Sequence, residues 1–327
     1  MTTSPLRWGA VLVVALAIGA IGAPVFAPFP PERQLDPAVG RLLPPGTARY
    51  VIDGIGGGTT LAEAVTRDGA SLEITRAGAA LTIPLSEVAD PGAAGLPERR
   101  VFLLGTDTFG RDVLSRLLHG ARTSLAIGGL AALLAVLVGV SLGSIAGFAG
   151  GWIDVALMRL VDALLAFPRL FLVIALAALL DSTGGVLVLV LGLTGWMGAA
   201  RLTRAEVRAL RRREFVEAAH AIGQRPREIV RRHLLPNAIV PVAIDTALRV
   251  GDIILVEAAL SFLGLGERPP TATWGNMVAE GATQLPSAWW ISTLPGLAIV
   301  ATVIGLNLIA DGLRDALDPR LRNRETP

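Results

Sequence analysis

The chain has 327 residues, of which 52% are hydrophobic, 17% are charged and 37 are glycine. This profile excludes an ordinary soluble domain and is typical of a helical membrane protein. The net charge of +2 is too small to indicate a nucleic-acid partner, and the absence of cysteine excludes disulfides and thiolate metal sites. The three histidines, His119, His220 and His233, are scattered, so we expect no metal site.

Residues 8–29 form an apolar run that follows Arg7 and is long enough to cross a bilayer. We expect residues 1–29 to be a retained N-terminal transmembrane helix, ended by prolines. The alternative is a cleaved signal peptide, because the small residues Gly22 and Ala23 lie near the end of the run. The weak charge before the run and its length favour the retained helix.

Residues 30–104 have a different character, with many glycines and prolines between short alternating segments at 48–52 and 71–75. The glycine triplet at 56–58 and the Asp-Gly pair at 68–69 predict turns. The triplet is not a phosphate loop, because no Lys-Ser or Lys-Thr follows it. The segment is predicted to be a small, mostly β extracytoplasmic insert.

After the insert, an amphipathic segment over 105–120 leads into long apolar runs, and a tail follows over 313–327. We expect an all-α membrane domain over 121–312, with six spans in total. Besides the first helix, the predicted spans are 121–149, 156–180, 185–203, 238–264 and 291–312. Within 121–149, Gly139, Gly143 and Gly147 lie on one helix face and predict close packing against another helix.

Arginine sets the predicted orientation, since the chain contains no lysine. The connection over 201–236 carries ten Arg and four acids, and the C-terminal tail is also basic. By the positive-inside rule, both segments and both termini are cytoplasmic. The insert over 30–104 has seven Arg and nine acids, which fits the outer side.

The basic connection has the pattern of two short helices joined by a turn. Ala218, Ala219 and Ala221 favour a helix, and Gly223 can end it in the left-handed conformation. Pro226 suits the first turn of a second helix, and we expect Pro236 to break that helix before the next span. A solvated loop made for topology alone is the simplest alternative, and tethering between two spans argues against a DNA-binding role.

The fifth span carries Asp245, Arg249, Asp252 and Glu257. Charges inside a membrane normally face partners or a water-filled cavity. Asp245 and Arg249 are spaced i, i+4, so we expect them to form an ion pair. Asp252 and Glu257, with Ser261 one turn beyond Glu257, are candidates for the translocation path.

A charged motif precedes the second span. We expect it to form an outer-surface turn whose acids cap a short helix over 113–118, with a role in contacting a binding protein as an alternative. The motif residues are Gly105, Thr106, Asp107, Gly110, Arg111 and Asp112.

The pattern Glu217-Ala218-Ala219, then Gly223, then Leu235-Pro236 after eleven intervening residues resembles the EAA loop of ABC importer permeases. The position that is usually Ile in that loop is His233 here, or Leu234 if the alignment moves by one. The resemblance implies that Glu217, Ala218, Ala219, Gly223, Leu235 and Pro236 belong to a coupling loop over 204–237 that docks on a cytoplasmic ATPase.

Further segments point to one subfamily. The segments over 105–116, 162–168, 257–266, 274–277 and 311–320 are similar to the C-type membrane subunit of dipeptide, oligopeptide and nickel permeases. Together they cover about residues 103–322, and the insert lies outside the resemblance.

The resemblance implies the six-span type I ABC importer fold in the bacterial cytoplasmic membrane. It also implies a second permease subunit, two ATPase subunits that bind ATP and Mg²⁺, and an extracytoplasmic substrate-binding protein. The chain has no phosphate-binding loop with its Lys, so we expect no catalytic residue and no cofactor in it. The cargo is predicted to be di- or oligopeptides, with nickel chelates, glutathione and sugars as alternatives. Two other classes stay open: an ion-driven transporter with Asp252 or Glu257 as proton site, and a membrane-bound sensor or scaffold built on the insert.

Overall fold

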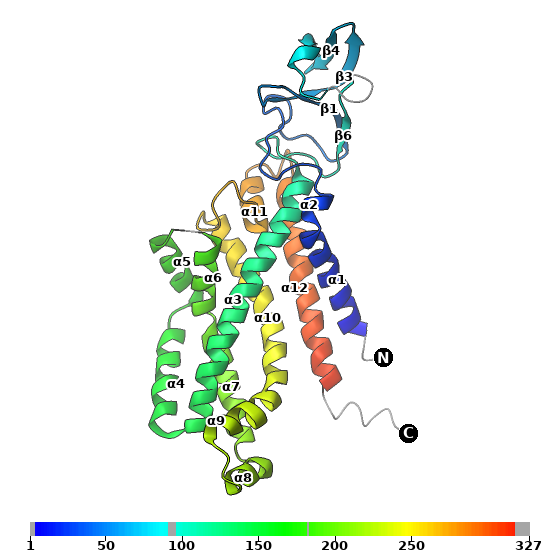
Figure 1. Cartoon of the computed structure of the whole chain (residues 1–327). Helices are drawn as coiled ribbons and strands as arrows, with labels where there is room; N and C mark the ends of the chain where they lie inside the picture. Colours follow the sequence, from blue (N-terminus) through cyan, green and yellow to red (C-terminus); the bar gives the residue numbers. More distant parts are fainter. Residues whose placement is uncertain (1–3, 91–95, 182, 318–327) are drawn as a thin grey trace. The chain divides into compact units, whose positions relative to one another are not determined.

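The computed structural model describes residues 4–90, 96–181 and 183–317. These residues are mostly helical, which confirms the predicted helical fold (Figure 1). Their contacts define two compact units, and the divisions between them fall within three helices. The three helices are α1 (Ser4–Ile21), α3 (Val113–Ala149) and α12 (Trp290–Leu317).

The first unit is entirely helical over its described residues and holds 4–17, 124–268 and 299–317. Its apolar core gathers side chains from α3, α5, α6 and α10, among them Ile127, Leu191 and Ile253. Besides parts of the three shared helices, it contains α4 (Gly151–Leu165), α5 (Arg169–Leu179), α6 (Gly184–Leu193), α7 (Trp196–Leu210), α8 (Glu214–Ala221), α9 (Pro226–Ile229), the π-helical turn η2 (Val230–Leu234) and α10 (Leu235–Phe262).

Two of the predicted spans are bent pairs of helices. The chain turns by 81° between α4 and α5, where one straight span over 156–180 was predicted. Pro168 lacks an N–H and disfavours helical geometry at Phe167, which explains the break. A second bend of 41° separates α6 from α7, inside the predicted span 185–203. There the Thr194 hydroxyl donates to the Val190 carbonyl oxygen at 2.7 Å, a back-bond that bends helices.

The glycine face of α3 packs closely on α7, as the sequence predicts. A Cβ at Gly139 would lie 2.6 Å from the Cβ of Ala199, and one at Gly143 would lie 2.4 Å from the carbonyl oxygen of Ala200. A Cβ at Gly147 would lie 2.8 Å from the carbonyl oxygen of Arg204. Only residues without a side chain let the two backbones approach so closely.

The second unit holds 18–123 and 269–298 and contains all the strands of the described residues. Two three-stranded antiparallel sheets have the orders β2-β1-β6 and β3-β4-β5. The other elements are α2 (Ala23–Phe26), the 3₁₀ turn η1 (Leu85–Glu87), α11 (Trp274–Ala282) and the first turns of α3 and α12. The strands are β1 (Thr47–Asp53), β2 (Thr59–Ala62), β3 (Ala64–Asp68), β4 (Ser71–Arg76), β5 (Ala79–Pro84) and β6 (Arg99–Phe102).

An ion pair fixes the β part of the second unit. Asp36, 3% exposed, accepts hydrogen bonds from Arg76 Nε at 2.9 Å and from the Leu61 amide at 3.0 Å. Burial raises the pKa of Asp36, but the hydrogen bonds from Arg76 and Leu61 outweigh it and hold the pKa below its usual value. The carboxylate therefore ties the segment before β1 to strands β2 and β4.

Length and composition mark only some helices as membrane-spanning. Two single helices, Val113–Ala149 and Trp290–Ala316, are long and apolar enough, and the number rises to four if each bent pair is one span. The described apolar part of α1, Pro5–Ile21, is shorter. Helix α3 also starts at Val113, so no break separates the predicted amphipathic segment from the predicted span at 121.

Candidate functional site

The basic connection after α7 folds into two short helices. Helix α8 ends before Gly223, whose φ of +79° is the left-handed conformation predicted for this position. Pro226 occupies the first turn of α9, also as predicted. The prediction that Pro236 breaks the chain before the next span was wrong. Pro236 lies in the first turn of α10, where its missing N–H does no harm, and η2 leads straight into that helix.

The two-helix element has one buried face. Val216 and Ala219 of α8 pack with Ile229, Leu234 and Val207 of α7 in a small apolar core. The ring of His220 stacks on Phe148 with centroids 6.3 Å apart. This packing attaches α8 to the ends of α3 and α7 (Figure 1).

The other face of the element is exposed. Glu217, Ala218, Gly223 and Pro236 are exposed, whereas Ala219 is buried and Leu235 is half-buried. The predicted coupling residues therefore divide into a buried anchor and a surface open to a partner. A small, flat helix surface with one carboxylate, held rigidly by its opposite face, suits docking into a groove.

The charges of α10 form two separate constellations. Arg249 pairs with Asp245, as predicted, and its Nη1 donates to the Gly195 carbonyl oxygen at 3.1 Å, at the α6–α7 bend. Asp252 pairs instead with Arg169, the first residue of α5. The sequence did not predict this pair, because the partners are 83 residues apart; an Arg directly after Pro168 inside an apolar run was the available signal.

Glu257 and Ser261 lie away from that pair. Glu257 is 1% exposed, and the Ser261 hydroxyl donates to its Oε1 at 2.9 Å. The structure thus brings Glu257 and Ser261 together, as their spacing indicates, but does not join them to Asp252.

The charged motif before α3 is buried, so the prediction of an exposed outer-surface turn was wrong. Asp107 accepts from Arg111 Nε at 2.7 Å and from Arg116 Nη1 at 2.6 Å, and both arginines also donate to Glu280 of α11. The side chains of Arg111, Arg116 and Asp107 are 6%, 1% and 1% exposed. Their surroundings are a closed four-membered ion cluster, which leaves these charges no surface for a partner.

The remaining motif residues hold the backbone around the cluster. Asp112 caps α3 as predicted, accepting from the Ser115 amide at 2.7 Å. Burial raises the pKa of Asp112 in spite of this bond. Thr106 donates to the Gly40 carbonyl oxygen at 2.6 Å, and Gly105 and Gly110 have the φ values of +77° and +75° that glycine tolerates.

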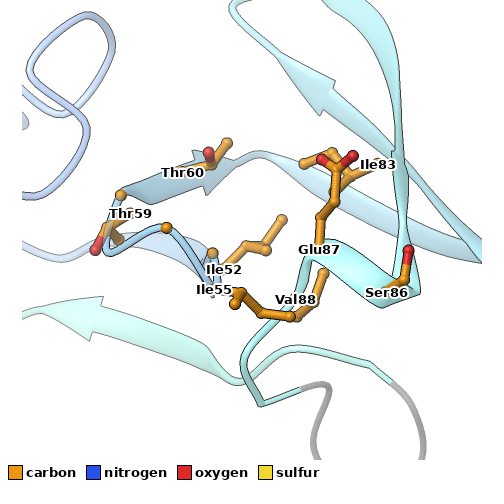
Figure 2. Close-up of a pocket in the computed structure, with 11 residues that line it drawn as sticks. Ile52, Ile55, Thr59, Thr60, Ile83, Ser86, Glu87 and Val88 are labelled. Atoms are coloured by element: carbon orange, nitrogen blue, oxygen red, sulfur yellow. The ribbon is translucent and has the colours of Figure 1, made fainter.

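The insert carries a pocket of about 600 Å³ between the Gly54–Gly58 turn and the 3₁₀ turn η1. In Figure 2, Ile52, Ile55 and Val88 gather on one side, and the Glu87 carboxylate lies beside Ile83. The residues that line it include one carboxylate and no Arg or His. No group of three or more His, Asp or Glu in the described part of the chain could hold a metal ion. The pocket offers no acid–base pair for catalysis.

The helical first unit, the two helices of its exposed basic element and the charges along α10 define an integral membrane component. The family model described as "Binding-protein-dependent transport system inner membrane component" matches residues 139–323. The chain belongs to this family of permease subunits of ABC importers.

Three relatives have printed names that give a cargo. The dipeptide transport system permease protein DppC of Alkalihalophilus pseudofirmus is 41% identical over 67% of this chain and 72% of its own length. The di/tripeptide permease DppC of Pseudomonas aeruginosa is 42% identical over 68% and 73%. The glutathione permease GsiD of Pectobacterium atrosepticum is 39% identical over 67% and 73%. A chain of the inward-facing MetNI methionine ABC transporter aligns with 62% of this chain and 96% of its own, at 17% identity and a TM-score of 0.47.

Proposed function

We propose that this chain is one of two permease subunits of an importer for di- or oligopeptides, driven by ATP hydrolysis in separate subunits. The observation that carries the proposal is the α8–α9 element. Its Val216–Ala219 face is fixed to α7, and its Glu217–Ala218 face is exposed for a partner. The peptide cargo is supported by relatives at 41% and 42% identity that are named for dipeptides and di/tripeptides.

The proposed topology has six spans. They are α1, α3, the bent pair α4–α5, the bent pair α6–α7, α10 and α12, with both termini and α8–α9 in the cytoplasm. Helix α1 is short, but a Cβ at its Gly9 would lie 2.6 Å from the Gly305 carbonyl oxygen of α12, so the two helices are in close contact. Ion pairing of Asp245 and Asp252 lowers the cost of placing α10 in the membrane.

The proposed cycle is alternating access. Two cytoplasmic ATPases bind ATP and Mg²⁺, and their closure moves α8 and α9. Because α9 and η2 continue into α10, this movement reaches a spanning helix directly. An extracytoplasmic binding protein delivers the peptide to the cavity between the two permeases. In this scheme the chain contributes no catalytic residue and holds no cofactor.

The experiment is reconstitution of the whole importer in proteoliposomes, with peptide uptake and ATP hydrolysis measured together. Glu217→Ala and Gly223→Pro should lower uptake at least 10-fold relative to ATP hydrolysis, with the protein still in the membrane. Glu214→Ala is the matched control, because Glu214 is an exposed acid on the same helix. Uptake that needs a proton gradient and no ATPase subunit would instead establish the ion-driven alternative.

A further inference from the structure

The Asp252–Arg169 pair lies deep along α10. Asp252 is 17 residues beyond Leu235 in a helix of 28, or about 26 Å along an axis of about 42 Å at 1.5 Å per residue. Arg169 begins α5, directly after the 81° bend. If α10 spans the membrane as proposed, this ion pair lies within the apolar layer.

The pair faces outward from the packing of this chain. The side chain of Asp252 is 57% exposed and that of Arg169 is 27% exposed. A charge that faces lipid at the bilayer centre costs about 2.5–3.5 kcal/mol or more. The surface that Asp252 faces in the assembled importer must therefore be the second permease or the aqueous path between the two.

Arg169 retains hydrogen-bonding capacity. Its Nη1 binds Asp252, while its Nε and Nη2 make no hydrogen bond within the described residues. A Cβ at Gly195 would lie 3.3 Å from Nη2, so the glycine of the α6–α7 bend provides the room for this guanidinium. Nε and Nη2 form the edge with which Arg binds a carboxylate through two hydrogen bonds.

We propose that Asp252 and Arg169 receive the two charged ends of a peptide during its passage. Asp252 takes the α-ammonium group and Arg169 takes the α-carboxylate. One ion pair is exchanged for two, so no charge is left unpaired in a poorly hydrated site, which is the condition for low cost. The inference rests on the proposed peptide cargo and adds to it the groups that the permease recognises.

The second pair on α10 provides an internal contrast. Asp245 and Arg249 have side chains 28% and 20% exposed, and Arg249 also holds the Gly195 carbonyl. That pair braces the α6–α7 bend within the chain. Its loss should lower the stability of the chain and have no preference for the ends of the peptide.

The test uses the whole importer in proteoliposomes with three forms of one peptide: free at both ends, N-acetylated, and C-amidated. Asp252→Asn should reduce uptake of the free peptide about 10-fold, as expected for a lost charge-assisted hydrogen bond, and uptake of the N-acetylated form less than about 2-fold. Arg169→Gln should show the same selectivity toward the C-amidated form. Each variant is compared with wild type on the same peptide, so the preferences of the binding protein cancel.

Two control variants distinguish peptide recognition from a general loss of charge or of assembly. Asp181→Asn removes an exposed ion pair with Arg268 outside α5 and α10 and should leave uptake unchanged. The exchange Asp252→Arg with Arg169→Asp keeps an ion pair and should assemble, yet transport the free peptide poorly. Equal losses for all three peptides, or failure of the variants to copurify with the second permease, would overturn the inference. A wild-type importer that moves none of the peptides would refute the proposed cargo instead.

Discussion

Asp154 of α4 accepts hydrogen bonds from both Nε and Nη2 of Arg204 on α7, the latter at 2.6 Å. Asp154 is 8% exposed, so solvent screens the pair less than it screens a surface ion pair. Helix α7 leads at Leu210 into the turn before α8. The carboxylate therefore holds the helix that supports the exposed Glu217–Ala218 face.

Arg204→Lys should destabilise the protein although it keeps the charge, because lysine lacks the planar pair of donors. We expect a loss of about 1–3 kcal/mol, the range for hydrogen bonds to charged groups, seen as a lower Tm in detergent. Arg201→Lys is the control, since Arg201 and Asp162 are about half exposed, at 51% and 52%. Exposed pairs contribute little, so an equal fall in Tm for both variants would contradict the assignment.

Gly143→Ala should weaken the contact between α3 and α7. The new methyl group would lie 2.4 Å from the Ala200 carbonyl oxygen, so the helices must separate, at a cost of about 1–3 kcal/mol for overpacking. Thermal unfolding of the purified protein measures the effect. Gly129→Ala in the same helix meets nothing within 4 Å and should leave Tm unchanged or raise it. A stabilising Gly143→Ala would disprove the close contact.

Glu280→Gln should disrupt the ion cluster that joins α11 to the segment before α3. It leaves Arg111 and Arg116 with only Asp107 as a charged partner. Breaking a buried pair costs about 3 kcal/mol or more, which should appear as a lower Tm and faster hydrogen exchange in α11. Glu98→Gln removes a pair with Arg100 whose side chains are 67% and 43% exposed, and it should change neither quantity.

The Asp36–Arg76 pair should make the insert sensitive to acid. The folded-state pKa of Asp36 lies below the ordinary 3.8, so the pair stabilises the fold fully above that pH. The contribution is lost as the pH falls through the folded value. Asp36→Asn should therefore speed hydrogen exchange in β2 and β4 of the whole protein at pH 7, and the difference from wild type should shrink below pH 3.8.

Variants are compared at one pH, so the intrinsic exchange rate cancels. Asp53→Asn is the control, because the Asp53 side chain is 43% exposed and its pair with Arg33 is more strongly screened. A difference between Asp36→Asn and wild type that grows in acid would contradict the assigned sign.

Patterns within one segment were predictable from sequence. The apolar runs indicated the helices, the spacing of Gly139, Gly143 and Gly147 indicated a packing face, and the left-handed turn at Gly223 follows from residue type. Each of these depends on neighbours within a few turns. The bend before Arg169 was also present in the sequence as Pro168, but the apolar run on both sides of it concealed the break.

Contacts between distant segments were not predictable. Arg111 and Glu280 are 169 residues apart, and without that partner the Gly105–Asp112 motif has the composition of an exposed turn. Arg169 and Asp252 are similarly separated in sequence. Pro236 was misjudged for a different reason: its effect depends on whether it falls in the interior or the first turn of a helix.

From Pro226 to Phe262 the backbone is helical throughout, with Ile229, Val230, Leu234 and Leu235 all in right-handed geometry. At 1.5 Å per residue this is a rod of roughly 55 Å, with the cytoplasmic docking surface beside one end and Asp252 far along its length. Arg169 belongs to a different helix, so rotation of the rod about its axis would swing the carboxylate away from the guanidinium. Nucleotide binding in one compartment could thereby unlock a charged gate in another, with no flexible joint between them.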